Sequence, residues 1–417
     1  MMPEKFDPLI ALLELVQPGL SPEELYLRAA HLEPGEWDAI IAQAYKQDLA
    51  ELLYALLLQL NRSHGLEIPQ KERLHHSFLS TTAKNMLILH DTEAVFSALH
   101  KAGIPAAGLK GIYLLENIYG DIGARSMNDI DILVKRSDLK GAIEVLKGLG
   151  YSQTSYFSLD DLNADTKHVP SMQKSGSPLL EVHWTLLEEN EPFTIDPDAL
   201  WQRNLPAKIA NVAALALGVE DLILHLCLHL TYQHYLQLGL RGLLDVALVI
   251  QKFREQIDWQ KLVRIAKSWR AERVTALTMK LVETQLNVPI PSEVYNDLLP
   301  KPLEPEILQD ARSVLLERGE QGERLTPDLV QLNDSRNLYA KLKISLQRVF
   351  IPRIALARTY NVPPNSPKII GLYWVRVKYL FRNYWGTVRR LQVGENSSQP
   401  ALDKAKKSYS LHKWMTK

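Results

Sequence analysis

The chain has 417 residues, of which 46% are hydrophobic and 23% charged, with 20 glycines and 23 prolines. This composition excludes a disordered, collagen-like or low-complexity chain, and the length suits two or three domains with cores of their own. The 48 basic and 48 acidic residues cancel, yet residues 336–417 hold 17 Lys and Arg against two acids. This division predicts that the basic end meets an anionic partner or the protein's own acidic surface.

Cysteine content and hydropathy limit the class of protein further. A single cysteine, Cys227, excludes an intramolecular disulfide framework and a cysteine-based zinc site. No stretch has the roughly 18 uncharged apolar residues of a membrane-spanning helix. The first 20 residues carry Glu4 and Asp7 and lack a basic n-region, so we expect no signal peptide and a cytoplasmic location.

The N-terminal part, residues 7–76, is predicted to be helical. Ser21, Pro22 and Glu24 form a capping box with proline at the first helical position, which predicts a helix start. Residues 37–60 have apolar side chains at helical spacing, and a further helix is predicted over 80–101, ending at Gly103.

The pattern then alternates between strands and helices. Short strands are predicted at 104–109 and 129–134, with a helical segment at 112–119 between them. Ser137 is predicted to cap a helix over 138–149. Two apolar runs flank a Ser-Gly-Ser-Pro turn and predict a hairpin, at residues 169–174 and 179–186. This order of elements is typical of the α+β class.

From residue 218 onward the chain again has helical periodicity. Amphipathic helices are predicted over 219–235, 239–253, 259–269 and 271–286, and five prolines between 289 and 305 predict a linker. We therefore expect four parts: an N-terminal helical region, an α+β core, a helical domain, and a linker with a basic aromatic-rich region, over residues 1–77, 78–205, 206–300 and 301–417.

The strongest chemical signal is the acidic strand at 129–134. Asp129 and Asp131 are two positions apart, so both carboxylates project from the same face of a strand. Two neighbouring anions raise each other's pKa, and a divalent cation removes that conflict. Hard carboxylate oxygens suit Mg²⁺ or Mn²⁺, which predicts a phosphoryl-transfer site. The alternative is that the two aspartates only solvate one face of an edge strand.

A third carboxylate is available on the next predicted strand. Glu181 and His183 also share a face, so the same two-residue period exposes them together. His183 could orient a metal-bound carboxylate or contact phosphate, or be a hydrogen-bonded structural histidine.

A glycine-containing turn follows the first predicted strand. Gly108, Lys110 and Gly111 lie where a strand passes into a helix, and backbone N–H groups at such a start can bind phosphate. Lys110 could add its charge toward a β- or γ-phosphate. The alternative is an ordinary strand-to-helix turn with a solvated lysine.

The ordered combination of these motifs resembles the DNA polymerase β-like nucleotidyltransferase superfamily, and more closely its little-characterised bacterial branch. The likeness covers roughly residues 80–290, and a downstream His and Asp are matched by His229 and Asp245. The motifs that carry it are Leu109-Lys110-Gly111, Arg125-Ser126-Met127-Asn128-Asp129-Ile130-Asp131 and Glu181-Val182-His183-Trp184.

The resemblance implies a short mixed sheet flanked by helices, and Mg²⁺ held by three carboxylates. It further implies attack by an acceptor hydroxyl or phosphate on the α-phosphate of an NTP, expected to be ATP, with release of pyrophosphate. Asp129, Asp131 and Glu181 would then ligate the metal, and the turn 108–111 would hold the triphosphate. Lys110-Gly111 departs from the usual Gly-Ser, and the gap to Asp129 is longer than in many relatives.

Other candidates have both a functional and a structural interpretation. Arg125 could stabilise charge on the transferring phosphoryl group, or pair with Asp121, Asp129 or Asp131. His225 and His229 are four apart, but the leucines around them favour a buried helix over a metal site, and His229 is expected to pair with Asp245. Cys227 is expected to be an inert core residue.

The C-terminal region 336–417 holds 11 of the chain's 32 aromatic residues. A basic, aromatic-rich helix could lie on an anionic membrane surface, or stack against and neutralise a single-stranded nucleic acid. It could also pack over the acidic body and close the cleft around the triphosphate.

Beside nucleotidyl transfer, two functions stay open: a non-catalytic, membrane-associated accessory protein of the same fold, and kinase-like transfer of the γ-phosphate.

Overall fold

The N-terminal part of the computed structural model is a layer of four short helices. The Ser21 capping box is confirmed, since Ser21 accepts from the backbone of Glu24 and the Glu24 carboxylate accepts from the backbone of Ser21. The predicted helical run 37–60 is broken at Asp48, whose φ of 55° ends one helix and starts another. The four helices are α1 (Pro8–Leu15), α2 (Pro22–Ala29), α3 (Pro34–Lys46) and α4 (Ala50–Leu57). The structure describes residues 6–60, 67–155, 166–188, 190–317, 346, 349–363, 365–393 and 399–417.

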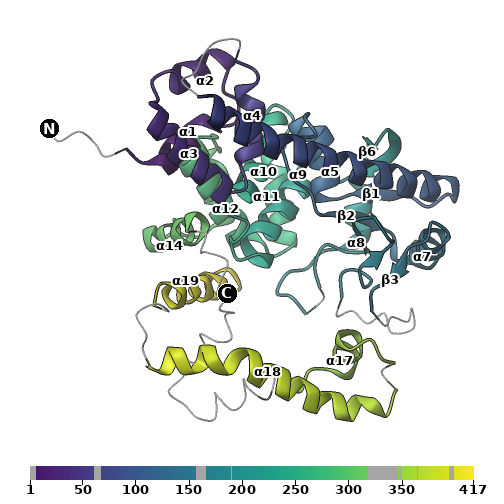
Figure 1. The fold of residues 1–417 in the computed structure, drawn as a ribbon. Coiled ribbons are helices and arrows are strands. Elements are labelled where there is room, and N and C mark those ends of the chain that lie inside the picture. Colours follow the sequence, from purple (N-terminus) through teal and green to yellow (C-terminus); the bar gives the residue numbers. More distant parts are fainter. Residues whose placement is uncertain are drawn as a thin grey trace.

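A single long helix connects this layer to the sheet (Figure 1). α5 (Ile68–Lys101) has 34 residues and begins well before the predicted start at residue 80. Pro69 occupies its first turn, where a missing N–H costs nothing, and the predicted end at Gly103 is confirmed by a φ of 70° there. α5 packs against α4 at one end and against strands of the central sheet further along.

The centre of the fold is a mixed seven-stranded sheet with the order β3-β4-β5-β2-β1-β7-β6. β2 pairs antiparallel with β1 and parallel with β5, while β7 pairs parallel with β1. The predicted strand 129–134 and the predicted hairpin are confirmed. The strands are β1 (Ala106–Gly108), β2 (Asp129–Val134), β3 (Ser152–Gln153), β4 (Met172–Gln173), β5 (Leu179–His183), β6 (Leu205–Ile209) and β7 (Val212–Ala216).

The hairpin of β6 and β7 was not among the predicted elements. Its two-residue turn uses Ala210 and Asn211, both with positive φ, at 46° and 65°. Periodicity does not predict β6, because the strand contains Pro206 and its apolar residues alternate only weakly. The sheet therefore extends to Ala216, beyond the expected core boundary at residue 205.

Short helices connect the strands. Ser137 was expected to cap α7, but its hydroxyl donates to Asp138 and a 3₁₀ turn precedes the helix, so that prediction is wrong. α6 continues as a π-helix, which the predicted segment 112–119 did not distinguish. These elements are α6 (Lys110–Leu114), η1 (Leu115–Tyr119), η2 (Arg136–Asp138), α7 (Leu139–Gly148) and α8 (Pro197–Gln202).

The predicted amphipathic helices after residue 218 are confirmed, although the first of them changes to a π-helix at Leu228. The proline-rich stretch 289–305 is not a simple linker: it contains α13, whose Val294 and Leu298 are buried in the main core. The bounds are α9 (Val219–Cys227), η4 (Leu228–Gln233), α10 (Gly239–Lys252), α11 (Trp259–Ser268), α12 (Glu272–Leu286), α13 (Ser292–Leu298) and α14 (Pro305–Leu316).

The C-terminal region divides into two parts. α19 (Gln399–Met415) packs against α12 and α14, and its Leu411 and Met415 are buried in the main core. α17 (Arg353–Thr359) and α18 (Lys368–Val393) share a small core of their own and lie beyond α19 at the edge of the molecule (Figure 1). In the described part of the chain, no helix is both long enough and apolar enough to cross a membrane.

Candidate active site

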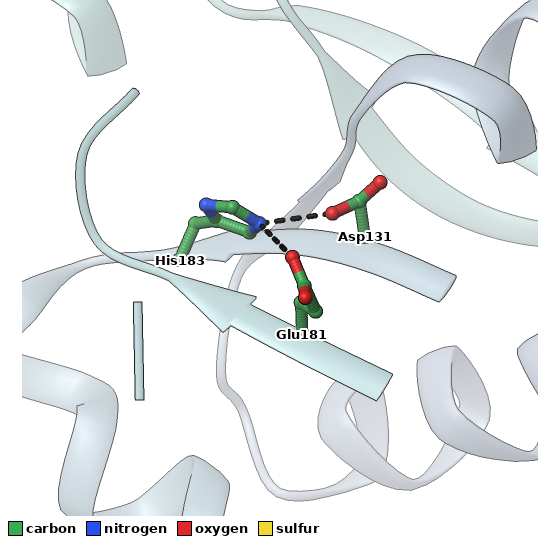
Figure 2. Close-up of side chains that lie close together, drawn as sticks. All are labelled: Asp131, Glu181 and His183. Atoms are coloured by element: carbon green, nitrogen blue, oxygen red, sulfur yellow. Dashed lines mark hydrogen bonds and ion pairs between the residues drawn. The ribbon is translucent and has the colours of Figure 1, made fainter. Parts of the chain in front are cut away.

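The parallel pairing of β2 with β5 sets the predicted acidic residues side by side. Asp131 is the register partner of Glu181, and His183 stands two residues further along β5. Side chains of paired residues in a sheet point to the same face, so the two-residue period that exposes Asp131 also aligns it with Glu181 and His183. Figure 2 shows the three side chains converging from the two strands.

The atoms of this group are close enough to share one cation. His183 Nε2 lies 2.9 Å from Asp131 Oδ1 and 3.4 Å from Glu181 Oε2, and the three ligand atoms all lie within 4.8 Å of one another. Neighbouring ligands of an octahedral Mg²⁺ are about 3 Å apart, because each is about 2.1 Å from the ion. Asp131 and His183 are 3% and 2% exposed, whereas Glu181 is 24% exposed and opens the group to solvent.

Lys110 supplies a positive charge to the group. Its Nζ lies 3.0 Å from Asp131 Oδ1, the same oxygen that His183 contacts. Burial disfavours the lysine's charge, but Asp131, Glu181 and Asp129 together outweigh that effect and raise the pKa of Lys110. Lys110 begins α6 with a φ of 46°, so the turn predicted at 108–111 bends its side chain back over β2.

The carboxyl groups of the site have different proton affinities. Burial acts to raise the pKa of Asp131, but Lys110 and His183 hold it well below the usual range. The hydrogen bond to His183 lowers the pKa of Glu181, which also accepts from Ser171 at 3.2 Å. Asp129, at the more open start of β2, has a raised pKa because it is partly desolvated and repelled by Asp131. Among the described residues, the Asp129 carboxylate lies outside the Asp131, Glu181 and His183 group.

Arg125 does not contact the carboxylates of β2. Its Nε and Nη2 each lie 2.8 Å from an oxygen of Asp245 on α10, and Tyr119 donates to the same carboxylate at 2.8 Å. The predicted partners Asp121, Asp129 and Asp131 are therefore wrong for this arginine. The expected pair of His229 with Asp245 is also wrong, because Asp245 accepts from Arg125 and Tyr119 instead.

The two glycines of the turn have packing roles. A side chain at Gly108 would come within 2.2 Å of Ile209 Cδ1 on β6. One at Gly111 would meet Arg125 Nη1 at 3.0 Å, so the glycine lets this guanidinium lie under the start of α6. The structure thus explains both glycines by close packing against β6 and Arg125.

A row of histidines lies on α9, η4 and the residue after them, and the sequence favoured two of them, His225 and His229, as core residues. The ring centroids of His225 and His229 are 6.1 Å apart, and those of His229 and His234 are 4.4 Å apart. Burial, and then the charge of Lys110, depress the pKa of both His225 and His229 well below the usual range. Their four-residue spacing was visible in the sequence, but only the fold brings them near enough to Lys110 for its charge to affect their pKa values.

Two further residues near the site were not predicted. Lys167 and His168 lie beside β5, where the N–H of Trp184 donates to the carbonyl of Lys167. The His168 ring centroid is 5.0 Å from that of His183, and burial together with Lys110 lowers the pKa of Lys167. The one sequence signal was that Lys167 and His168 directly precede the predicted hairpin.

Comparison with known protein families identifies the family of the chain. A family model described as an uncharacterised nucleotidyltransferase matches residues 33–287. The chain belongs to this nucleotidyltransferase family. The match includes the long helix α5, the whole sheet with its acidic group, and α9 to α12, so the resemblance inferred from the motifs is confirmed. Searches of curated proteins and of solved structures each found no match.

Proposed function

We propose that this chain is a metal-dependent nucleotidyltransferase that moves a nucleoside monophosphate from an NTP, expected to be ATP, to an acceptor. The acceptor oxygen would bond to the α-phosphorus, the bond from that phosphorus to the bridging oxygen would break, and pyrophosphate would leave. The observation that carries the proposal is the grouping of Asp131, Glu181 and His183 in a nucleotidyltransferase family chain.

The donor set fits a hard divalent cation. The two carboxylates supply the oxygen ligands that suit Mg²⁺ or Mn²⁺, and the imidazole adds one nitrogen ligand. Asp131, Glu181 and His183 would hold the ion, and Asp129 would approach from the open end of β2. When bound, the metal would stabilise the negative charge on the α-phosphate and the leaving pyrophosphate.

The remaining residues bind and position the nucleotide. Lys110 would exchange its ion pair with Asp131 for a β- or γ-phosphate oxygen, as a point charge of the kind that phosphate sites use. Arg125 is held by Asp245 and lies against Gly111, so we propose that it fixes the position of the turn 108–111. The acceptor's proton would pass to a nearby carboxylate such as Asp129, or to solvent.

The test uses the full-length protein with ATP labelled at the α- or the γ-phosphate, Mg²⁺ or Mn²⁺, and a panel of candidate acceptors that includes the chain itself. We expect α-label on an acceptor and release of pyrophosphate, detected by mass as the gain of one nucleoside monophosphate. Asp131→Asn should lower this transfer by more than about 100-fold, a larger effect than loss of a residue that only supports a ligand. Asp198→Asn, an exposed site on α8, is the matched control.

The other outcomes separate the open alternatives. γ-label on the acceptor with release of ADP would establish a kinase instead. No transfer, together with ATP binding that does not depend on metal or on Asp131, would establish a non-catalytic accessory protein.

A further inference from the structure

α18 presents large apolar side chains to solvent along one side. Ile370 is 75% exposed, Trp374 is 70% exposed and Phe381 is 59% exposed. At 100° per residue these three positions lie within about 40° of one another around the helix axis. They therefore form a single stripe, which we call the α18 apolar stripe.

The other side of α18 is already occupied. Ile369 is buried with Leu356 and Ala357 of α17, and the hydroxyl of Tyr373 donates to the backbone of Ile351 at 2.8 Å. The centre of the apolar stripe lies about 120° around the helix from Ile369. α17 thus fixes the orientation of α18 and leaves the stripe facing away from their shared core.

The charge of α18 is of one sign. The helix contains six Lys and Arg and no acid. Lys378 and Arg382 are exposed on one flank of the apolar stripe, about 60° and 100° around the helix from its centre. Val375 and Tyr379, 48% and 57% exposed, lie farther around the helix on that side and are not part of the stripe. An amphipathic helix with large apolar residues on one arc and basic residues at its border matches the surface of an anionic bilayer in both shape and charge.

We infer that α18 lies on an anionic lipid bilayer. Ile370, Trp374 and Phe381 would enter the boundary between headgroups and acyl chains, where tryptophan is favoured, while Lys378 and Arg382 would meet lipid phosphates. The helix lies on the membrane and does not span it, in agreement with the absence of a spanning helix among the described residues. Exposed aliphatic side chains such as Ile370 add nothing to base stacking, and this favours lipid over single-stranded nucleic acid.

The first test is co-sedimentation of the full-length protein with vesicles of phosphatidylcholine alone or with added phosphatidylglycerol. We expect binding to the anionic vesicles only, with a large loss in about 1 M salt, where the Debye length is about 3 Å. Equal sedimentation with both vesicle types, or none with either, would overturn the inference.

Variants locate the binding on α18. Lys378→Glu/Arg382→Glu should weaken partition into anionic vesicles by at least about tenfold, because each basic residue near the surface contributes about fivefold. Lys71→Glu/Lys101→Glu makes the same charge change at exposed sites on α5 and should leave binding intact. Equal losses for the two double variants would show that net charge, not α18, is responsible.

Apolar insertion has its own readout. Lipids brominated on their acyl chains should quench tryptophan fluorescence, and Trp374→Phe should remove most of that quenching while the vesicles still bind. Ile370→Ser/Trp374→Ser should reduce binding, whereas Ile68→Ser/Leu87→Ser, at exposed apolar sites of α5, should not. Tight binding of a fluorescent single-stranded oligonucleotide, lost in Lys378→Glu/Arg382→Glu while vesicles fail to bind, would overturn the proposal in favour of nucleic acid.

Discussion

A divalent cation held as proposed would compete with Lys110 for the Asp131 carboxylate. The lysine Nζ is 3.0 Å from Oδ1 and His183 Nε2 is 2.9 Å from it, so this oxygen is the common point of the site. The ammonium keeps Asp131 ionised while no metal is bound, because it holds the pKa of that carboxyl down. Under the proposed function, this contact would weaken when a metal ion binds the carboxylate.

Substitution of Lys110 should therefore change the affinities for a metal ion and for ATP in opposite directions. Lys110→Met removes the charge but keeps a side chain of similar length. Because Mn²⁺ then no longer displaces a charge-assisted hydrogen bond, we expect it to bind about tenfold more tightly in the absence of nucleotide. ATP affinity should fall, since a phosphate contact is lost. Titration calorimetry measures both, with exposed Lys140→Met as the control. Weaker Mn²⁺ binding would contradict the competition.

The sequence supports the site residues to different degrees. Asp131, Glu181 and His183 were predictable because the two-residue strand period aligns side chains and needs no knowledge of distant contacts. The pair of Arg125 with Asp245 was not, because the two residues are 120 positions apart and several nearer acids competed as partners. Periodicity identifies residues that share a face of one element, but it does not predict which charged residues form ion pairs between distant parts of the chain.

Between elements, the pair of Arg125 and Asp245 joins the loop before β2 to α10. Both side chains are nearly buried, at 10% and 7% exposure, and Tyr119 of η1 adds a third contact. Removal of one partner leaves a buried charge without compensation, a far larger cost than loss of an exposed pair.

Asp245→Asn should accordingly lower the free energy of unfolding by about 3–5 kcal/mol, measured by urea titration. The matched control is Asp38→Asn, which breaks an ion pair with Arg73 of similar length whose side chains are 53% and 59% exposed. That control should cost less than about 1 kcal/mol. A similar loss in both variants would show that burial does not govern this pair.

Elements with strong periodicity were predictable, and those set by tertiary contacts were not. β2 and α10 to α12 follow from apolar spacing, whereas the strand β6 carries Pro206 and gains its place by pairing with β7. Gly108 shows the same limit: the glycine was read as part of a phosphate turn, and its contact with Ile209 became visible only in the folded sheet.

At the scale of the whole molecule, α19 belongs to the body although it lies far along the basic C-terminal region. Leu411 and Met415 are 2% and 4% exposed in the main core. Leu411→Ala should therefore lower the free energy of unfolding by about 2–5 kcal/mol. Trp374→Ala on α18, where the side chain is 70% exposed, should change it little. A negligible effect of Leu411→Ala in urea titration would show that the packing of α19 does not contribute to the stability of the body.

The buried histidines predict how stability depends on pH. The pKa values of His225 and His229 are lowered on folding, so below the unfolded-state value of about 6.5 the unfolded chain binds protons that the folded chain does not. Stability should fall as pH drops below about 6.5, by up to about 1.4 kcal/mol per pH unit for each histidine. His225→Leu/His229→Leu should flatten this slope in thermal unfolding between about pH 7 and 5, with exposed His100→Gln as control. An unchanged slope would exclude these two residues as its cause.

The docking of α19 on α14 brings together the two ends of a long stretch of chain. α14 ends at Leu316, α19 begins at Gln399, and Lys407 donates to Ser313 at 2.8 Å. Of the elements between these two helices, the structure describes α17 and α18, which share a core of their own, so this pair is placed as an insertion between two neighbouring helices of the body. Because the entropy of closing a loop grows only slowly with its length, such an insertion can be lengthened, shortened or exchanged during evolution at little cost to the stability of the body. A change in the surface that α17 and α18 present therefore need not alter the sheet.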